Sequence, residues 1–166
     1  MKRSTTRVES HLRALRLAPH PGDNGPYDEA TISRAEAAIG RRFAPEHREV
    51  LSQLGGTFGF RGGAVDVDGT DLNLKKFLGV GDDDFNIVDL WMFFAGQVPD
   101  QWYPFAEDHD GDLFLLDSAN AVLFVTLDKK LRARSERPKR SGSRVADSFE
   151  DFVKRLRAPW FAAELP

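Results

Sequence analysis

The sequence predicts an α+β domain in which a central, mainly antiparallel β-sheet is packed by N-terminal helices and a C-terminal helix. Two patterns predict this class. Helical periodicity occurs near both ends of the chain, and short apolar segments separated by turn residues lie between them. The chain has 166 residues, 41% of them hydrophobic, which is enough for one domain with a full core. We therefore expect a single domain over residues 1–166.

The N-terminal part of the chain is predicted to be helical apart from one loop. Residues 8–17 place apolar side chains at helical spacing. Residues 18–26 contain three prolines and two glycines, which is typical of a loop. Residues 28–39 form the next predicted helix, and Gly40 follows at a position where glycine commonly ends a helix.

This second predicted helix has more than one candidate cap. Ser33 and Glu36 have the spacing of a capping box, and Asp28 and Thr31 are the alternatives for an earlier first turn. A third helix is predicted to begin at Pro45, because a proline at the first helical position gives up an N–H that has no partner in the helix.

The middle of the chain combines short strands with turns and one apolar segment. We expect short strands over residues 57–61 and 64–67, a turn over residues 68–71 and a strand over residues 72–78. Residues 86–94 are apolar at nearly every position, so periodicity does not separate a helix from a buried strand. Their length and the loop signals on both sides favour a helix.

Three further strands and a last helix are predicted. Aromatic residues over 102–105 and apolar residues over 113–116 flank a turn that contains Asp and Gly, which predicts a β-hairpin. A strand over residues 121–127 extends the hairpin into a meander. Residues 129–144 carry eight basic side chains without periodicity. They are predicted to form a loop, and their composition is that of a flexible segment. The last helix is predicted over residues 145–156.

The final helix has strong terminal signals. Asp147 or Ser148 is expected to cap it, and Glu150 and Asp151 suit its positive N-terminal end. Basic side chains follow near its C-terminal end, where they complement the helix dipole.

Composition narrows the class of protein. The chain contains no cysteine, so neither a disulfide nor a thiolate takes part in its structure or chemistry. No apolar run approaches the about 20 residues that a membrane-spanning helix needs. The basic start of the chain lacks the apolar core of a secretory signal. We therefore expect a cytoplasmic protein without membrane contact.

The net charge of −3 conceals an uneven distribution of charge along the chain. Residues 62–128 contain 14 acidic and 2 basic side chains, whereas the parts before and after them are basic. Such a segment disfavours nucleic acid as a partner, because phosphate binding needs cations. It favours a basic protein as a partner.

One acidic turn has the composition of a phosphatase motif. Residues 66–70 resemble the Asp-x-Asp-Gly-Thr loop of haloacid-dehalogenase-type phosphatases, in which the first Asp attacks phosphorus. Only two apolar residues precede the motif here, where those enzymes have a buried strand, so we expect an acidic turn. The four histidines also lack the paired spacing of a zinc site.

A second acidic turn has part of a calcium-loop pattern. Residues 108–112 place carboxylates at the first, third and fifth positions of such a loop. Leu113 and Ala119 stand where the loop needs its glycine and its bidentate glutamate. We expect instead that Asp108 accepts hydrogen bonds from backbone N–H groups of the turn and that Gly111 adopts a positive φ, with no metal or cofactor bound.

Four motifs occur in a characteristic order along the chain. They are Ala35-Glu36 with Ile39-Gly40, Phe43-Ala44-Pro45 with Leu54-Gly55-Gly56, the run from Pro104 to Asp112, and the run from Val145 to Val153. Their order and spacing resemble the SUKH superfamily of SMI/KNR-type domains, which includes fungal regulators of cell-wall synthesis and bacterial toxin-immunity proteins. The resemblance covers about residues 28–157.

The resemblance implies an α+β domain without catalytic residues or a cofactor. For a bacterial member, it implies binding to a cognate toxin and its neutralisation. Together with the charge distribution, it predicts that acidic residues face a cationic toxin site, such as that of a nuclease, and that aromatic residues supply affinity. The predicted partner-binding residues are Asp66, Asp68, Asp71, Asp82, Asp83, Asp84, Trp102, Tyr103, Glu107, Asp108, Asp110 and Asp112.

Two other functions remain open from the sequence. The first is a regulatory scaffold like the fungal relatives, which would bind endogenous proteins instead of a toxin. The second is a metal-dependent hydrolase that uses the acidic turns. Tight binding of calcium, magnesium or manganese would favour the hydrolase.

Overall fold

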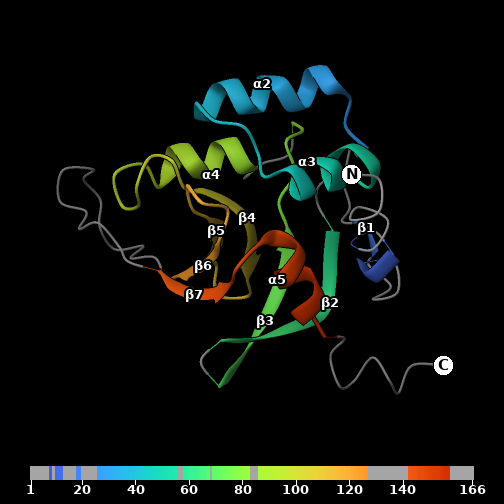
Figure 1. Ribbon diagram of the computed structural model, residues 1–166, viewed down its shortest axis with the longest axis vertical. Helices are drawn as coiled ribbons and strands as arrows, with labels where there is room; N and C mark the ends of the chain where they lie inside the picture. The colour runs from blue at the N-terminus through green and yellow to red at the C-terminus, as the bar shows by residue number, and fades with distance from the viewer. Residues whose placement is uncertain are drawn as a thin grey trace.

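The computed structural model is an α+β fold built on one seven-stranded antiparallel sheet, as predicted (Figure 1). The structure describes residues 8, 10–12, 18–19, 26–55, 58–67, 69–82, 86–126 and 142–157. Neighbouring strands in the sheet are also consecutive in the chain. The strands are β1 (Ala18–Pro19), β2 (Phe58–Val67), β3 (Thr70–Phe77), β4 (Tyr103–Asp108), β5 (Leu113–Leu116), β6 (Val122–Val125) and β7 (Ser143–Ala146).

The helices match those that the sequence predicts. They are α2 (Glu29–Ile39), α3 (Pro45–Gln53), α4 (Ile87–Phe93) and α5 (Phe149–Arg155). Val8 and Leu12 of the first predicted helix are helical and buried, whereas Leu15 lies outside the described residues. Within the described part of the chain, no helix is long and apolar enough to cross a membrane.

Both ends of α2 follow from local chemistry. The Asp28 side chain accepts a hydrogen bond from the N–H of Thr31 at 2.8 Å, and Gly40 ends the helix with a φ of 74°. The earlier start at Asp28 is therefore confirmed, and the capping box at Ser33 is wrong. Ser33 lies inside the helix, where its hydroxyl donates to Oε1 of Glu29 at 3.2 Å. Asp28 has the extended backbone that lets a carboxylate reach a free N–H of the first turn.

The other helix starts are also explained by their first residues. Helix α3 begins at Pro45, as predicted. In α4, the Asn86 side chain accepts from the N–H of Asp89 at 2.9 Å. In α5, Ser148 rather than Asp147 is the cap, and its hydroxyl accepts from the N–H of Asp151 at 3.1 Å.

Three strand assignments correct the prediction. The two short strands expected over residues 57–61 and 64–67 are one strand, β2, because pairing with β3 supplies partners along most of its length despite an irregular register between Gly59 and Gly63. Strand β1 occupies residues 18 and 19 of the expected loop and pairs with β2. The rest of that loop, residues 20–25, lies outside the described residues.

Strand β7 changes the predicted end of the basic loop and the start of the last helix. It takes Ser143 and Arg144 from the expected loop and Val145 and Ala146 from the expected helix. Pairing with β6 explains the difference, since the edge of β6 offers unpaired N–H and C=O groups. Residues 127–141 lie outside the described residues.

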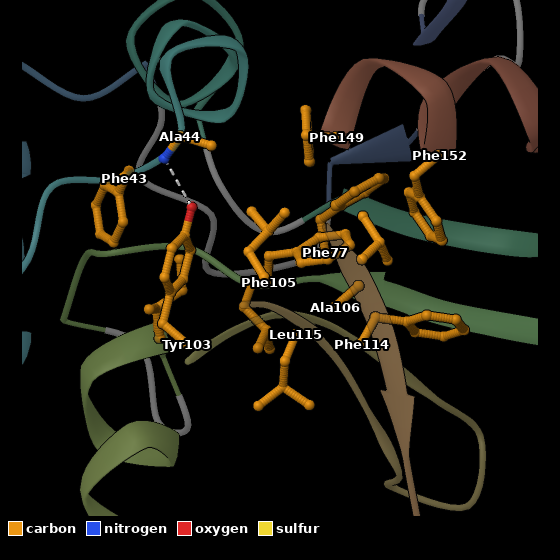
Figure 2. Close-up of a cluster of buried hydrophobic side chains, with 14 of the residues drawn as sticks. Phe43, Ala44, Phe77, Tyr103, Phe105, Ala106, Phe114, Leu115, Phe149 and Phe152 are labelled. Atoms are coloured by element: carbon orange, nitrogen blue, oxygen red, sulfur yellow. Dashed lines mark hydrogen bonds between the residues drawn. The ribbon is translucent and has the colours of Figure 1, made fainter. Parts of the chain in front are cut away.

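The core is aromatic and lies where the sheet meets α3 and α5 (Figure 2). Phe105 of β4 is fully buried and packs edge-on against Phe149 and Phe152 of α5, with ring centroids 5.4 and 5.1 Å apart. Figure 1 shows α2 and α4 together at one end of the molecule and the β2–β3 hairpin at the other. The two ends therefore present different surfaces.

Candidate functional site

The predicted acidic residues are divided between the two ends of β3. At one end, Asp66 and Asp71 pair across the β2–β3 hairpin. The β4–β5 turn points toward this same end, because β4 runs antiparallel to β3 and its last residue, Asp108, pairs with Leu74 in the middle of β3. Asp66, Asp71 and residues 107–112 thus form one group on β2, β3 and the β4–β5 turn, which we call the acidic sheet end.

Asp82 belongs to the opposite end of β3, beside α2. It lines a hollow together with Thr31 and Arg34 of α2. Most of β3 lies between Asp71 and this position. Asp68, Asp83 and Asp84 lie outside the described residues.

Much of the charge at the acidic sheet end is balanced within the molecule. Glu107 is buried, and its carboxylate lies 3.3 Å from Nζ of Lys75 and 3.7 Å from Nζ of Lys76. Asp71 forms an ion pair with Arg157. The backbone of Arg157 also exchanges two hydrogen bonds with Ala64, which fixes the end of α5 against the edge of β2. These carboxylates hold the fold together at this end.

The Asp108 carboxylate accepts hydrogen bonds from the backbone of its own turn. Its Oδ1 accepts hydrogen bonds from the N–H groups of Asp110 and Asp112 at 2.9 and 2.8 Å, and Gly111 has a φ of 80°. The predicted cap and the predicted positive φ are both confirmed. Burial raises the pKa of the Asp108 carboxyl, with smaller opposing contributions from these hydrogen bonds. Among the described residues, no three His, Asp or Glu side chains are arranged to hold a metal ion.

The two predicted aromatic contact residues have different environments. Tyr103 opens β4 and is fully buried, so its side chain is not accessible to a partner on this surface. Trp102 is half-buried and packs against the core. Glu107 and Asp108, two of the predicted acidic contacts, are also buried. At this end of the sheet, a partner could therefore reach the exposed carboxylates, such as that of Asp66.

Tyr103 instead forms a buried polar cluster with α3. Its hydroxyl accepts a hydrogen bond from the N–H of Ala44 at 3.0 Å and lies 3.1 Å from Nδ1 of His47. Burial lowers the pKa of His47 to about 3, with a smaller contribution from the charge of Arg41. Burial also raises the pKa of the Tyr103 hydroxyl. Both side chains are therefore neutral at neutral pH.

Arg41 connects three loops. Its guanidinium donates to the carbonyl oxygens of Gln101 and Asp117 at 2.6 and 2.8 Å, and to Oδ1 of Asn120 at 2.7 Å. It also lies over the ring of Tyr103, 4.8 Å from the centroid. Arg41 thereby ties the α2–α3 connection to the segments before β4 and after β5.

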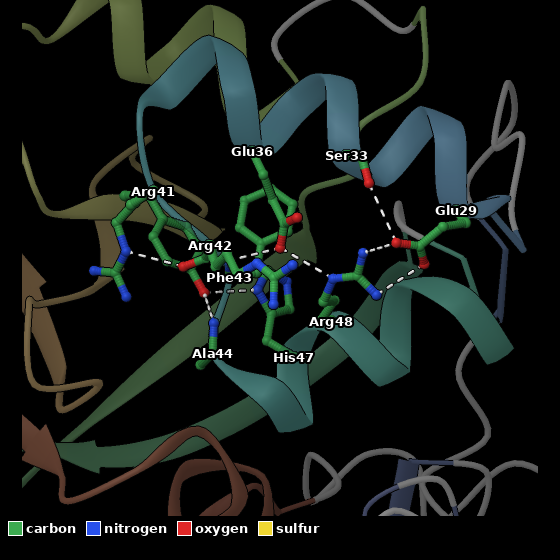
Figure 3. A network of polar contacts seen from close by, with 10 residues as sticks. Glu29, Ser33, Glu36, Arg41, Arg42, Phe43, Ala44, His47 and Arg48 are labelled. Carbon is green, nitrogen blue, oxygen red and sulfur yellow. Dashed lines mark hydrogen bonds and ion pairs between the residues drawn. The ribbon is translucent and has the colours of Figure 1, made fainter.

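A second polar network joins α2 to α3 (Figure 3). The buried Glu36 accepts hydrogen bonds from the N–H of Phe43 and from Nε of Arg48, each at 3.0 Å. Arg48 also forms an ion pair with Glu29, which lowers the pKa of that carboxyl. Glu36 belongs to one of the four motifs of the sequence. Its two hydrogen bonds show that this residue joins α2 to α3 and to the segment between them.

The largest exposed apolar side chains of the described residues lie on α4. Met92 and Phe93 are 62% and 57% exposed. Two hollows lie between α2 and α4. The wider one, of about 710 Å³, includes Val88 in its lining, and the narrower one, of about 330 Å³, includes Trp91. Met92 and Phe93 lie on α4 outside the linings of both hollows.

Sequence reasoning did not select the α4 residues as a contact site. The available signal was the apolar character of residues 86–94 at nearly every position. A helix that lies on a sheet buries one face, so a helix that is apolar all round leaves apolar side chains in solvent. In the sequence, this pattern is compatible with a helix or a buried strand and does not by itself identify a contact surface.

The comparisons with known proteins agree with the fold. The family described as SMI1 / KNR4 family (SUKH-1) matches residues 26–155. The matched range includes every described element from α2 to α5, and only β1 and the N-terminal helical residues precede it. No curated protein matches the chain significantly.

Proposed function

Because the chain belongs to the SMI1 / KNR4 family (SUKH-1), we propose that it is a non-enzymatic protein-binding domain that neutralises a bacterial toxin by stoichiometric occlusion. The family match over residues 26–155 carries this proposal, together with the resemblance to immunity proteins. A cytoplasmic location goes with the proposal, since a nuclease toxin acts there. In this mechanism the protein covers the toxin's active site and performs no chemistry.

The charge distribution supports a cationic partner. The segment over residues 62–128 has a large excess of acidic side chains. Exposed carboxylates occur at both ends of β3, with Asp66 at one end and Asp82 at the other. Opposite charge on the partner would speed association, as it does for nuclease inhibitors in general. Buried apolar contacts would supply most of the affinity.

Co-expression tests the proposal. The product of the neighbouring gene is expressed in a bacterial host with and without this protein, and growth is measured. We expect the neighbouring product alone to stop growth and the pair to grow normally. The purified proteins should form a 1:1 complex whose association rate falls steeply as salt increases.

The outcomes separate the proposed function from its alternatives. If the neighbouring product is toxic and this protein does not restore growth, the immunity proposal is wrong. A neighbouring product without toxicity, combined with specific capture of endogenous proteins, would instead favour a regulatory scaffold. Tight binding of a divalent cation in calorimetry would favour the hydrolase.

A further inference from the structure

The narrower hollow, of about 330 Å³, takes its walls from three segments of the chain. They are the end of α2 at Gly40, the last part of α4 at Trp91, and the connection from α4 to β4 at Ala95 and Asp100. Figure 1 shows α2 and α4 together at one end of the molecule. Ligand pockets commonly measure about 300–1,000 Å³, so a hollow at the small end of this range suits a single side chain of a partner.

The indole of Trp91 is a fixed part of this hollow. Trp91 is half-buried, and its indole N–H donates to the carbonyl oxygen of Asp100 at 3.1 Å. This hydrogen bond joins α4 to the connection before β4. An aromatic side chain that is already held in place loses little conformational entropy when a partner covers it. Among aromatic side chains, tryptophan also attracts a cation most strongly.

The Asp100 carboxylate gives the hollow an exposed negative charge. Asp100 is exposed, and among the residues that the structure describes no ion pair involves its side chain. Ile39 and Gly40 place the C-terminal end of α2 at the same hollow, and this end of a helix carries a partial negative charge. The carboxylate and the helix end both favour a cation.

Arg41 lines the same hollow, but its donors are used within the protein. Its Nε donates to the carbonyl oxygen of Arg42 at 3.1 Å, and its two terminal nitrogens donate to three oxygens of the neighbouring loops. A guanidinium has five N–H groups, so these hydrogen bonds use most of them. An acidic group of a partner would find few free donors on Arg41, whereas the Asp100 carboxylate can still accept.

These features together select a basic side chain as the occupant. Lys and Arg combine an aliphatic stem that packs on apolar surface with a charged head. Trp91 and Ala95 offer the apolar surface, and Asp100 offers the opposite charge. A second copy of the chain fits less well, because these residues belong to the acidic segment over residues 62–128. A two-fold contact would bring two such segments together, and like charges at an interface cost free energy.

We infer that the hollow formed by Trp91, Ala95 and Asp100 beside the end of α2 receives a lysine or arginine side chain of the toxin. The head of this side chain pairs with Asp100, and its stem covers the indole of Trp91. The inference rests on the proposed function and names the site that recognises the partner. None of the contact residues predicted from the sequence lines this hollow.

Asp100→Asn tests the ion pair, because it removes the charge and keeps the shape of the side chain. Binding to the product of the neighbouring gene is measured by calorimetry and by surface plasmon resonance. We expect Kd to rise about tenfold or more, mainly through faster dissociation, because a partner's charge would be left buried without its counterpart. The midpoint of urea unfolding should not change. Asp89→Asn is the matched control, since Asp89 is an exposed carboxylate of α4 outside both hollows, and it should change Kd less than about twofold.

Two substitutions of Trp91 test the aromatic wall. Trp91→Phe and Trp91→Leu both lose the hydrogen bond to Asp100, but only phenylalanine keeps an aromatic face. We expect Trp91→Leu to bind about fivefold more weakly than Trp91→Phe, because a cation gains from the aromatic ring as well as from the apolar surface. Equal affinities of the two variants would show that no cation lies against this wall.

The possible results separate this inference from the proposed function. If the wild type binds and protects but Asp100→Asn binds within about twofold of it, the hollow does not hold a basic side chain. If Asp100→Asn and Asp89→Asn weaken binding equally, the charges act at a distance and the inference is wrong. If the wild type neither binds nor protects, the proposed function fails and the inference fails with it. Sedimentation of the protein alone adds a check, because a dimer that Asp100→Asn dissociates would show a second copy as the occupant and overturn the inference.

Discussion

Nδ1 of His47 lies 3.1 Å from the hydroxyl oxygen of Tyr103, and both side chains are buried in the aromatic core. The rings stack with centroids 5.6 Å apart. The same hydroxyl accepts a hydrogen bond from the N–H of Ala44, which is the N-cap of α3 and has no side-chain cap of its own. A side chain from β4 thus joins the start of α3 to the sheet.

Removal of the Tyr103 hydroxyl should destabilise the protein. In Tyr103→Phe, the N–H of Ala44 loses its buried partner and His47 loses its contact at Nδ1, while the ring keeps its packing. An unsatisfied buried polar group costs about 1–3 kcal/mol. Urea unfolding at pH 7 measures this loss, and a decrease in the free energy of unfolding below about 0.5 kcal/mol would contradict the role that we assign to the hydroxyl.

The stability should depend on pH through His47. Burial lowers the pKa of this imidazole to about 3, whereas in the unfolded chain it keeps its ordinary value of 6.5. Between these values the unfolded state binds a proton that the folded state does not, so stability decreases as the pH falls below 6.5, by up to about 1.4 kcal/mol per pH unit. Above pH 7 both states are neutral and the contribution is flat.

His47→Gln isolates this contribution, because glutamine can still form a hydrogen bond but does not titrate. The free energy of unfolding is measured from pH 7.5 to pH 4.5 for the wild type and the variant. All other titrating groups contribute equally to both profiles, so their difference reports on His47. Parallel profiles over this range would show that His47 is protonated in the folded state like an exposed histidine.

Arg41 should contribute far more to stability than its neighbour. Arg41→Ala removes a charged donor from three acceptors in two different loops, so we expect a loss of about 2–3 kcal/mol in the free energy of unfolding. Arg42→Ala is the matched control, because its side chain is exposed, and should change stability by less than about 0.5 kcal/mol. Equal effects of both substitutions would mean that net charge matters more than these hydrogen bonds.

Local sequence signals predicted most of the elements. The Gly40 stop, the Pro45 start and the apolar face of the last helix depend on a few neighbouring residues, and the structure has each of them. The strands β2 and β7 were predicted less well, because their extents depend on pairing with β3 and β6. How far two strands pair is not contained in the local pattern of apolar residues of either strand.

The site was harder to predict than the fold. Sequence counts identified an acidic middle segment, but they contain no information on which carboxylates point toward lysines and which face solvent. Glu107 lies between two lysines, and Asp82 lies at the other end of β3. Likewise, the exposure of Phe93 and the burial of Tyr103 depend on which face each element presents to the core. Both residues appeared equally apolar and aromatic in the sequence.

The acidic β4–β5 turn should tolerate Asn but not Ala at position 108. Oδ1 of Asp108 accepts two backbone N–H groups of the turn, and an Asn side chain offers the same oxygen without the charge that burial disfavours. We expect Asp108→Ala to lower the free energy of unfolding by about 1–3 kcal/mol, and Asp108→Asn to keep it within about 1 kcal/mol of the wild type at pH 7.

The raised pKa of Asp108 also sets the pH dependence of the difference in stability between Asp108→Asn and the wild type. The folded state holds this proton more tightly than the unfolded state, so the advantage of Asn over Asp should shrink as the pH falls through the acidic range. Thermal unfolding of the three proteins at pH 7 and pH 4 tests both expectations. An Asn variant as unstable as the Ala variant would show that the carboxylate charge, rather than its acceptor oxygen, holds the turn.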